Sequence, residues 1–217
     1  MMIEFPYRYI TVEGNIGAGK TSFTKMVTKE YECTQILEQF ADNPFLPLFY
    51  ENPKRYAFTV ELFFMTERYK QLEDSFIVQQ NLFADFTISD YAFIKTLIFA
   101  RKNLNEREFK LFQQLFLTLQ NNFPNPDLFV YLHRNVDILL KNIKKRGRDF
   151  EKNITREYLY NIQDSYFEYF RNIVTFPVLI IDLGDIDFIQ DNSHYDLLKT
   201  IIAKKYQPGV HRVSLNM

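Results

Sequence analysis

The chain has 217 residues, 47% of them hydrophobic and 24% charged, which is a typical globular composition and predicts a single domain over residues 1–217. Its net charge of −1 argues against a broad nucleic-acid-binding surface, and its single cysteine, Cys33, excludes an intramolecular disulfide and a cysteine-based metal cluster. Because we find no long apolar run and no secretory signal, we expect a cytoplasmic protein without a membrane span.

Apolar periodicity predicts strands that alternate with helices along the chain. The expected strands are Tyr7–Val12, Phe76–Asp85, Asp127–Leu132 and Pro177–Leu183, and the expected helices are Thr21–Lys29, Arg55–Asp74, Asp90–Arg101, Glu106–Asn121, Val136–Arg146, Thr155–Val174 and Tyr195–Lys205. Thr155 is the expected N-cap of its helix. This alternation predicts a helix-rich α/β fold with a central parallel sheet covered on both faces. Because helix outweighs strand, some helices should pack on other helices.

A glycine-rich turn joins the first expected strand to the first expected helix. Its sequence, GNIGAGKT over 14–21, matches the phosphate-binding pattern G-x-x-x-x-G-K-[ST]. Glycines let backbone N–H groups turn toward an anion, and the helix N-terminus adds its dipole. The candidate nucleotide-binding residues are Gly14, Asn15, Ile16, Gly17, Ala18, Gly19, Lys20, Thr21 and Ser22.

ATP and Mg²⁺ are the ligands that this loop predicts. Lys20 can reach the β- and γ-phosphates, and the Thr21 hydroxyl can ligate Mg²⁺. Asp85, at the end of the strand expected over Phe76–Asp85, is the candidate second group of the magnesium shell. We find no Asn-Lys-x-Asp guanine-reading stretch and no clear acidic Walker B strand, so a P-loop kinase is favoured over a GTPase or a larger ATPase.

A basic segment, KKRGRDFE over 144–151, is the second motif. Arg146 and Arg148 are candidates for a mobile lid, because guanidinium groups stabilise the charge of a phosphoryl group in transfer and a lid excludes water. The alternative is a solvated basic helix end.

With these two motifs the chain resembles the deoxynucleoside kinase family, nearest to its bacterial deoxyadenosine/deoxyguanosine kinase branch. The segments that carry the resemblance are EGNIGAGKTS, LEQFADNPFLPLFYENPKRYAF, KKRGRDFE and ITREYL, and it covers essentially the whole chain. The resemblance implies transfer of the γ-phosphate of ATP to the 5′-hydroxyl of a deoxynucleoside, with a purine as the leading acceptor, in nucleotide salvage. It also implies a homodimer formed through a helical interface.

The resemblance further implies roles for single residues. Glu38 stands at the position of the general base, which would take the proton of the 5′-hydroxyl. Lys20, Arg146 and Arg148 would stabilise the phosphoryl group. The other implied contacts are Tyr50 and Glu151 with the deoxyribose 3′-hydroxyl, Arg68, Glu61 and Asp90 with the base, and Asp185 and Phe188, near the ends of the adenine loop, with ATP.

Two positions depart from the family pattern. The family has Glu/Asp-Arg-Ser/Thr after its third strand, where we align Asp85-Phe86-Thr87, so Phe86 replaces an arginine for which Lys145 or another cation could compensate. The family also has Gln where this chain has Glu61, whose carboxylate could read the N1–H and N2–H₂ edge of guanine or pair with Arg68.

Structural alternatives stand beside these roles. Glu38 could be a surface acid, Tyr50 a core residue and Asp90 a helix N-cap. For the whole chain, the alternatives are a nucleoside monophosphate kinase and a nucleotide-binding subunit or sensor without catalysis, which the missing arginine would favour.

Overall fold

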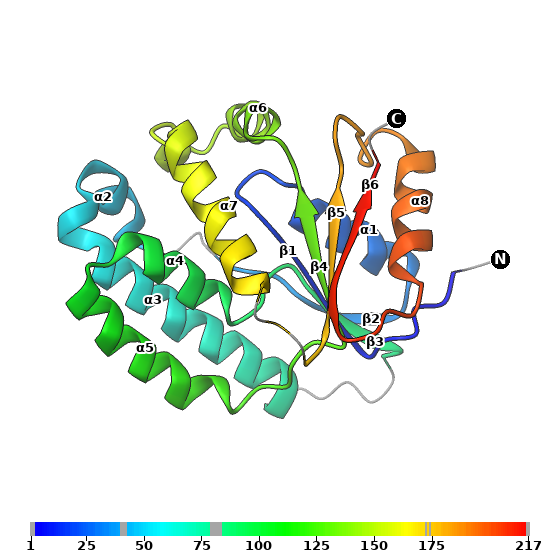
Figure 1. Cartoon of the computed structure of the whole chain (residues 1–217), viewed down its shortest axis with the longest axis horizontal. Helices are drawn as coiled ribbons and strands as arrows, with labels where there is room; N and C mark the ends of the chain where they lie inside the picture. Colours follow the sequence, from blue (N-terminus) through cyan, green and yellow to red (C-terminus); the bar gives the residue numbers. More distant parts are fainter. Residues whose placement is uncertain (1–2, 40–42, 79–83, 172, 174, 216–217) are drawn as a thin grey trace.

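The computed structural model describes residues 3–39, 43–78, 84–171, 173 and 175–215. Within them, one six-stranded sheet has the order β2-β3-β1-β4-β5-β6, and every neighbouring pair of strands is parallel (Figure 1). The strands are β1 (Tyr9–Gly14), β2 (Cys33–Ile36), β3 (Phe86–Ser89), β4 (Leu128–His133), β5 (Pro177–Asp182) and β6 (Gly209–Ser214). The predicted α/β fold with a parallel sheet is therefore confirmed.

Helices cover both faces of this sheet. They are α1 (Lys20–Glu30), α2 (Leu46–Glu51), α3 (Pro53–Glu73), α4 (Lys95–Asn103), α5 (Glu106–Gln120), α6 (Val136–Arg146), α7 (Arg156–Phe170) and α8 (Asn192–Ile202). In Figure 1, α1 and α8 lie to the right of the sheet, whereas α7, α4, α3 and α5 lie to its left. Among the described helices, none combines the length and the apolar character needed to cross a membrane.

The central strands are apolar on both faces because both faces are covered. In β4, Val130 and Leu132 pack into one core with α1, α6 and α8, whereas Phe129 and Tyr131 pack into another with α4 and α7. Successive side chains of a strand point to opposite faces, so a continuous apolar run is what a doubly covered parallel strand requires. This explains why the sequence predicted β1, β4 and β5 correctly.

A third core lies mainly among helices, with Ile36 of β2 and the segment after β3 at its edge, and confirms the expectation that helices pack on helices. Helices α2, α3, α4 and α5 bury Val60, Phe64, Phe112 and Phe116 against one another. Helix α5 begins with a capping box, in which the Asn105 side chain accepts from the N–H of residue 108. The layer stands beside the sheet and provides one wall of the site described below.

The third strand was predicted in the wrong place. Residues Asp74–Val78 continue α3 as a π-helical turn, residues 79–83 lie outside the described part of the chain, and β3 begins only at Phe86. The error arose because the apolar residues after α3 belong to the end of that helix. The polar strand β2, the half-exposed edge strand β6 and the short helix α2 had no strong signal and were not predicted.

Helix boundaries also differ from the predictions. Helix α4 begins at Lys95 rather than at Asp90, and α7 ends at Phe170, while the predicted end at Val174 lies outside the described residues. Thr155 is confirmed as the N-cap of α7, since its side chain accepts from the N–H of Tyr158. Because the strands are parallel, their carboxyl ends share one edge, where the glycine-rich turn after β1 lies.

Candidate functional site

The turn between β1 and α1 has the backbone that its glycines were expected to permit. Gly17 and Gly19 have φ angles of 84° and 98°, in the left-handed region. A Cβ atom on Gly17 would lie 2.9 Å from the carbonyl oxygen of Leu139, and one on Gly19 would lie 2.9 Å from Cζ of Phe188. Both positions therefore require glycine, and the turn packs closely against α6 and the segment after β5.

Side chains lock this turn in place. Lys20 folds over it, with Nζ 2.9 Å from the carbonyl oxygen of Gly14 and 3.0 Å from that of Asn15. The Asn15 amide donates to the carbonyl of Leu159 at 2.7 Å, and the Asn142 amide donates to that of Gly17 at 2.9 Å. Burial and, to a smaller extent, the nearby charge of Lys95 lower the pKa of Lys20 to about 8. The loop is thus preformed for an anion rather than collapsed.

A cavity of about 690 Å³ opens beside the turn. Residues from three of the segments singled out in the sequence line it, namely Ile16, Gly17, Gly19, Lys20, Thr21 and Ser22 of the turn, Glu38, Tyr50, Glu61 and Arg68 of the middle segments, and Arg146, Arg148 and Glu151 of the basic segment. Aromatic side chains, among them Phe49, Phe64, Phe99 and Tyr158, form much of the remaining wall. A cavity with polar groups at the glycine-rich turn and aromatic side chains in the rest of its wall suits a small aromatic molecule.

Glu38 lies at the centre of the cavity and is held by two cations. Arg68 donates from Nε (2.9 Å) and Nη2 (2.6 Å) to Oε1, and the Lys95 ammonium donates to Oε2. Burial alone would raise the pKa of Glu38, but Lys95 and Arg68 outweigh burial and hold this pKa at about 2. With only 6% of its surface exposed, Glu38 is not the surface acid of the alternative reading.

Asp90 connects Glu38 to the glycine-rich turn. Its Oδ1 accepts from the backbone N–H of Glu38 at 2.7 Å, and its Oδ2 accepts from the Thr21 hydroxyl. The N-cap of α4 is Ile94, so Asp90 is not a helix cap. Its expected place beside a base is also wrong, because the residue lies at the phosphate end of the site, where burial raises its pKa.

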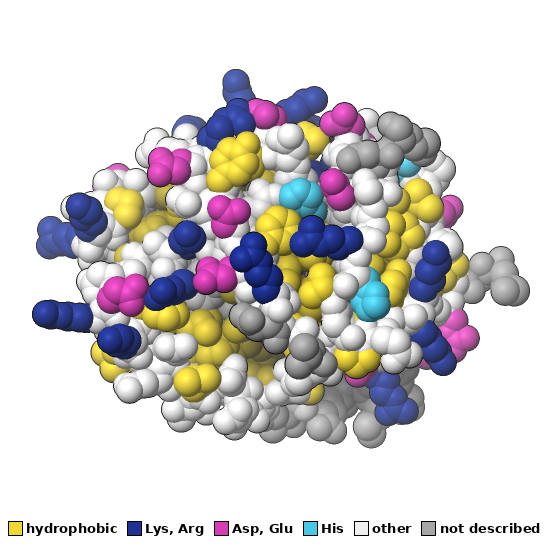
Figure 2. Space-filling model, viewed as in Figure 1, with side chains coloured by type: hydrophobic (Ala, Val, Ile, Leu, Met, Phe, Trp, Pro, Cys, Tyr) yellow, Lys and Arg dark blue, Asp and Glu magenta, His cyan; other side chains and the backbone are white. Residues whose placement is uncertain are grey.

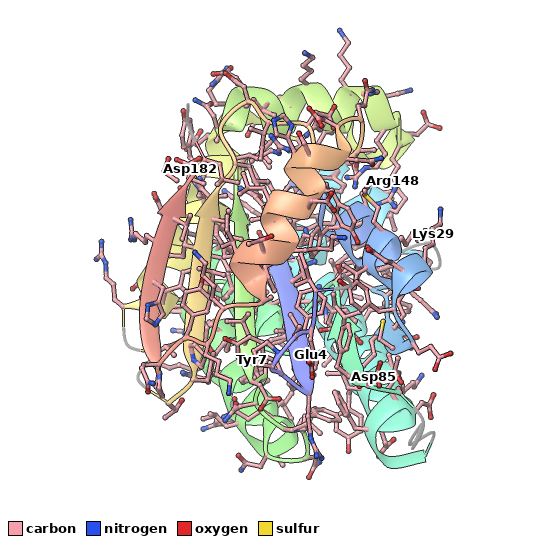
Figure 3. The ribbon with its side chains drawn as sticks, turned by 90° about the vertical axis from the view of Figure 1, so that its right-hand side faces the viewer. Glu4, Tyr7, Lys29, Asp85, Arg148 and Asp182 are labelled. Carbon is pink, nitrogen blue, oxygen red and sulfur yellow. The ribbon has the colours of Figure 1, made fainter. Side chains whose placement is uncertain are left out.

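Asp85 does not belong to the site. It precedes β3, and its N–H donates to the carbonyl of Glu32. Figure 3 shows it at the lower end of the molecule, at the level of Glu4 and Tyr7 and far from Arg148 at the opposite end. The predicted magnesium role of Asp85 is therefore corrected, because Asp85 precedes the first residue of β3 and the acid that follows its last residue is Asp90.

The interpretation that Phe86 replaces a family arginine is also corrected, because Phe86 lies at the start of β3 and not at its carboxyl end. Phe86 begins β3 and packs edge-to-face on Phe5, with ring centroids 5.3 Å apart, away from the cavity. The residue that follows the acid at the carboxyl end of β3 is Tyr91, which is fully buried and donates its hydroxyl proton to Gln71. Lys145, offered as a compensating cation, is exposed and does not line the cavity.

Glu61, in α3, also lines the cavity. Its Oε1 accepts from the Asn103 amide at 2.6 Å, while its Oε2 is buried without a hydrogen-bond partner among the described residues. Burial raises the pKa of Glu61 to about 7. Arg68 donates instead to Glu38 and to the Thr96 hydroxyl, so it does not neutralise Glu61 by direct pairing.

The basic segment closes one side of the cavity. Gly147, in the left-handed conformation, ends α6, and beyond it Glu151 is 95% buried, with 5% of its surface exposed. Arg146 donates to both oxygens of Glu151, at 3.1 and 2.6 Å, and Arg148 donates to Oε1 at 3.4 Å. Figure 2 shows a group of basic side chains at the upper edge of the molecule, over α6. Tyr50 lines the same cavity as Glu151. Burial and the negative charge of Glu151 raise the pKa of the Tyr50 hydroxyl.

The segment after β5 supports the glycine-rich turn from behind. Phe188 is fully buried against Gly19. Its ring is therefore not open to a ligand, which contradicts the expected contact with adenine. Asp185 lines a separate cavity, which it shares with His133 at the ends of β4 and β5. Arg134 fixes the segment by donating to the carbonyls of Gly184 (3.1 Å) and Ile186 (2.7 Å).

Comparison with known proteins decides the family. The deoxynucleoside kinase family model matches residues 10–206. The chain belongs to the deoxynucleoside kinase family. It is 33% identical to a deoxyguanosine kinase of Bacillus subtilis over 87% of this chain and 92% of that protein, and 30% identical to a deoxyadenosine kinase of Lactobacillus acidophilus over 92% and 97%. The fold matches that of a deoxyadenosine kinase from M. mycoides with bound dCTP, with a TM-score of 0.75 at 22% identity, over 89% of this chain and 97% of that one.

Sequence reasoning missed three residues of this kinase. Lys95 interrupts an otherwise apolar stretch of helix, and such a lone charge signals a buried partner. Arg134 directly follows β4, which is buried except at its last residue. It therefore lies where the chain leaves the sheet. Asn103 has no comparable signal, because its contact with Glu61 comes from a helix 42 residues away in sequence.

The raised pKa of Glu61 predicts a pH-dependent stability. Between its ordinary pKa of 4.5 and its folded value of about 7, the folded kinase holds a proton that the unfolded chain releases. The stabilising contribution of this proton is complete below pH 4.5 and is lost as the pH rises through 7. Glu61→Gln should therefore raise the free energy of unfolding by about 3 kcal/mol at pH 8.5 and very little at pH 5, measured by urea denaturation.

The matched control is Glu51→Gln, at an exposed position of α2. This substitution should leave the free energy of unfolding unchanged at both pH values. An equal effect of Glu61→Gln at pH 5 and pH 8.5 would contradict the assignment of a raised pKa.

Proposed function

We propose that this kinase transfers the γ-phosphate of Mg²⁺-bound ATP to the 5′-hydroxyl of a purine deoxynucleoside, with deoxyguanosine as the preferred acceptor. The single observation that carries this proposal is the arrangement of the cavity, with Glu38 beside the phosphate loop and the half-satisfied carboxylate of Glu61 in the same cavity. The relatives from Bacillus subtilis, a deoxyguanosine kinase, and Lactobacillus acidophilus, a deoxyadenosine kinase, support a purine.

The residues at the end of the loop fit a magnesium ion. Mg²⁺ prefers oxygen ligands, and the Thr21 hydroxyl and the Asp90 carboxylate meet there. Bound by them, Mg²⁺ would neutralise negative charge on the β- and γ-phosphate oxygens. We therefore assign the role expected of Asp85 to Asp90.

The chain's own groups account for the transfer. The loop N–H groups and Lys20 hold the phosphates of ATP, and Glu38 accepts the proton of the 5′-hydroxyl as its oxygen attacks the γ-phosphorus. The bond to the bridging oxygen breaks, and its electrons stay with ADP. Because the transition state is loose, positioning of the hydroxyl counts for more than basicity, so the low pKa of Glu38 is compatible with this role. Arg146 and Arg148 stabilise the phosphoryl oxygens from the lid.

Glu61 favours guanine over adenine. An ionised carboxylate only accepts hydrogen bonds, and the N1–H and N2–H₂ groups of guanine only donate. Adenine presents an acceptor at N1, which meets Glu61 favourably only when the carboxyl group is protonated. Tyr50 and Glu151, close together under the lid, are the proposed partners of the deoxyribose 3′-hydroxyl.

We also propose a cytoplasmic homodimer that acts in nucleotide salvage, with residues 1–217 as one domain. The family resemblance supports the dimer, and the continuity of the cores around one sheet supports the single domain.

Turnover tests the function directly. Purified protein with Mg²⁺ and ATP should convert deoxyguanosine, and more slowly deoxyadenosine, to the monophosphate. Glu38→Gln should lower kcat about 100-fold or more, since the variant removes the proton acceptor. Glu32→Gln, the same change at an exposed position before β2, should leave kcat unchanged. If ATP raises the melting temperature but none of the four deoxynucleosides is phosphorylated, the protein is a non-catalytic nucleotide binder.

Base selectivity should depend on pH through Glu61. Below pH 7 Glu61 becomes protonated and can donate to adenine, so the ratio of kcat/KM for deoxyguanosine to that for deoxyadenosine should fall from pH 8.5 to pH 6. The expected change is about tenfold, the equivalent of one hydrogen bond. Glu61→Gln should favour deoxyadenosine at both pH values. A wild-type ratio that is constant with pH would rule out base reading by Glu61.

A further inference from the structure

Lys95 is a cation in an unfavourable place, because it is buried and lies at the N-terminus of a helix. It is the first residue of α4, and only 5% of its surface is exposed. The N-terminus of a helix carries a partial positive charge, and a buried ammonium loses its hydration, so Lys95 needs a carboxylate nearby. Lys20 adds a further like charge nearby. The hydrogen bond to Oε2 of Glu38 offsets these costs only while Glu38 remains ionised.

The two cations on Glu38 face different parts of the cavity. Arg68 takes Oε1 and is tied by Nη1 to Thr96 at 2.9 Å. Of the charges around Lys20, that of Lys95 has the strongest effect on its pKa, whereas Arg68 acts more strongly than Lys95 on the pKa of Glu61. Lys95 also lines the cavity together with Lys20 and Thr21 of the glycine-rich turn, so its ammonium can face a phosphate bound there.

We propose that Lys95 is a catalytic residue whose ammonium moves from Oε2 of Glu38 to an oxygen of the transferring phosphoryl group as Glu38 takes the proton of the acceptor hydroxyl. This inference rests on the proposed function. The new bond joins the hydroxyl oxygen to the γ-phosphorus, the bond from phosphorus to the bridging oxygen breaks with its electrons on ADP, and the proton stays on Glu38 until solvent removes it.

The charges explain why this shift favours the transition state. In the resting site Lys95 and Glu38 neutralise each other. Once Glu38 is protonated, the ammonium still has the carboxylate of Glu13 nearby but has lost the negative charge that it directly contacts, at the moment when negative charge gathers between the γ-phosphorus and ADP. The interaction of Lys95 with the phosphoryl group is thus stronger in the transition state than in the ground state, which is the condition for raising kcat.

The test compares three single variants and one double variant. Lys95→Met keeps the length of the side chain and removes the charge, and Lys95→Arg keeps a cation. Lys102→Met is the matched control, at an exposed position of the same helix. We expect Lys95→Met to lower kcat about 100-fold, with the KM values for deoxyguanosine and ATP within about threefold of wild type. Lys95→Arg should recover at least about a tenth of the wild-type kcat, and Lys102→Met should match wild type.

The double variant separates catalysis from positioning. If Lys95 contacts the phosphoryl group, Lys95→Met should lower kcat further, by about tenfold, in the Glu38→Gln background. An unchanged kcat in that background would show that Lys95 acts only by holding Glu38, and would overturn the proposal. A raised KM with unchanged kcat in Lys95→Met would overturn it too, as would a Lys95→Arg variant no more active than Lys95→Met.

Failure of this inference and failure of the proposed function give different results. If wild-type protein phosphorylates no deoxynucleoside, the proposed function fails. If wild-type and Lys95→Met proteins phosphorylate deoxyguanosine equally well, only the role of Lys95 fails. An ATP-dependent rise in melting temperature, measured for each variant, confirms that its phosphate loop is folded.

Discussion

The buried carboxylate of Glu38 is the constraint on which the site depends. An ionised carboxylate in the interior needs partners, and Glu38 finds them in Arg68 from α3, Lys95 from α4 and, through its backbone N–H, Asp90 at the end of β3. Glu38 therefore joins the helical layer to the sheet, beside the glycine-rich turn that precedes α1. Removing either cation would leave the buried carboxylate with one charged partner instead of two, so the geometry of the site and the packing of the two layers are specified together.

A second buried carboxyl group, that of Glu61, differs from Glu38 in its pKa. Glu38, between two cations, has a pKa of about 2, whereas Glu61, buried with one neutral amide partner, has a pKa of about 7. Two carboxyl groups whose environments push their pKa values apart are suited to different tasks. Under the proposed function, the first stays ionised beside the glycine-rich turn to accept a proton, and the second meets either a donor or an acceptor on a base. The aromatic wall between them accommodates the acceptor.

Much of the fold and part of the site were accessible from sequence, for identifiable physical reasons. The strands β4 and β5 are nearly continuous apolar runs, β1 is rich in β-branched and aromatic residues, and the glycine-rich turn depends on local backbone chemistry, so all of them leave local signals. The position of β3 does not, because the apolar residues that end α3 resemble a strand, and this shift led to the errors at Asp85 and Phe86. The pairing of Glu38 with Lys95 joins residues 57 positions apart and follows only from the three-dimensional arrangement.

The most direct test of this account is a crystal structure of the protein with deoxyguanosine and a non-hydrolysable ATP analogue. The account predicts that the 5′-hydroxyl lies within hydrogen-bond distance of the Glu38 carboxylate, with the γ-phosphate beside Lys20 and Lys95 and the guanine N1–H on Oε2 of Glu61. A nucleoside bound with its base toward the phosphate loop, or with its 5′-hydroxyl away from Glu38, would contradict it.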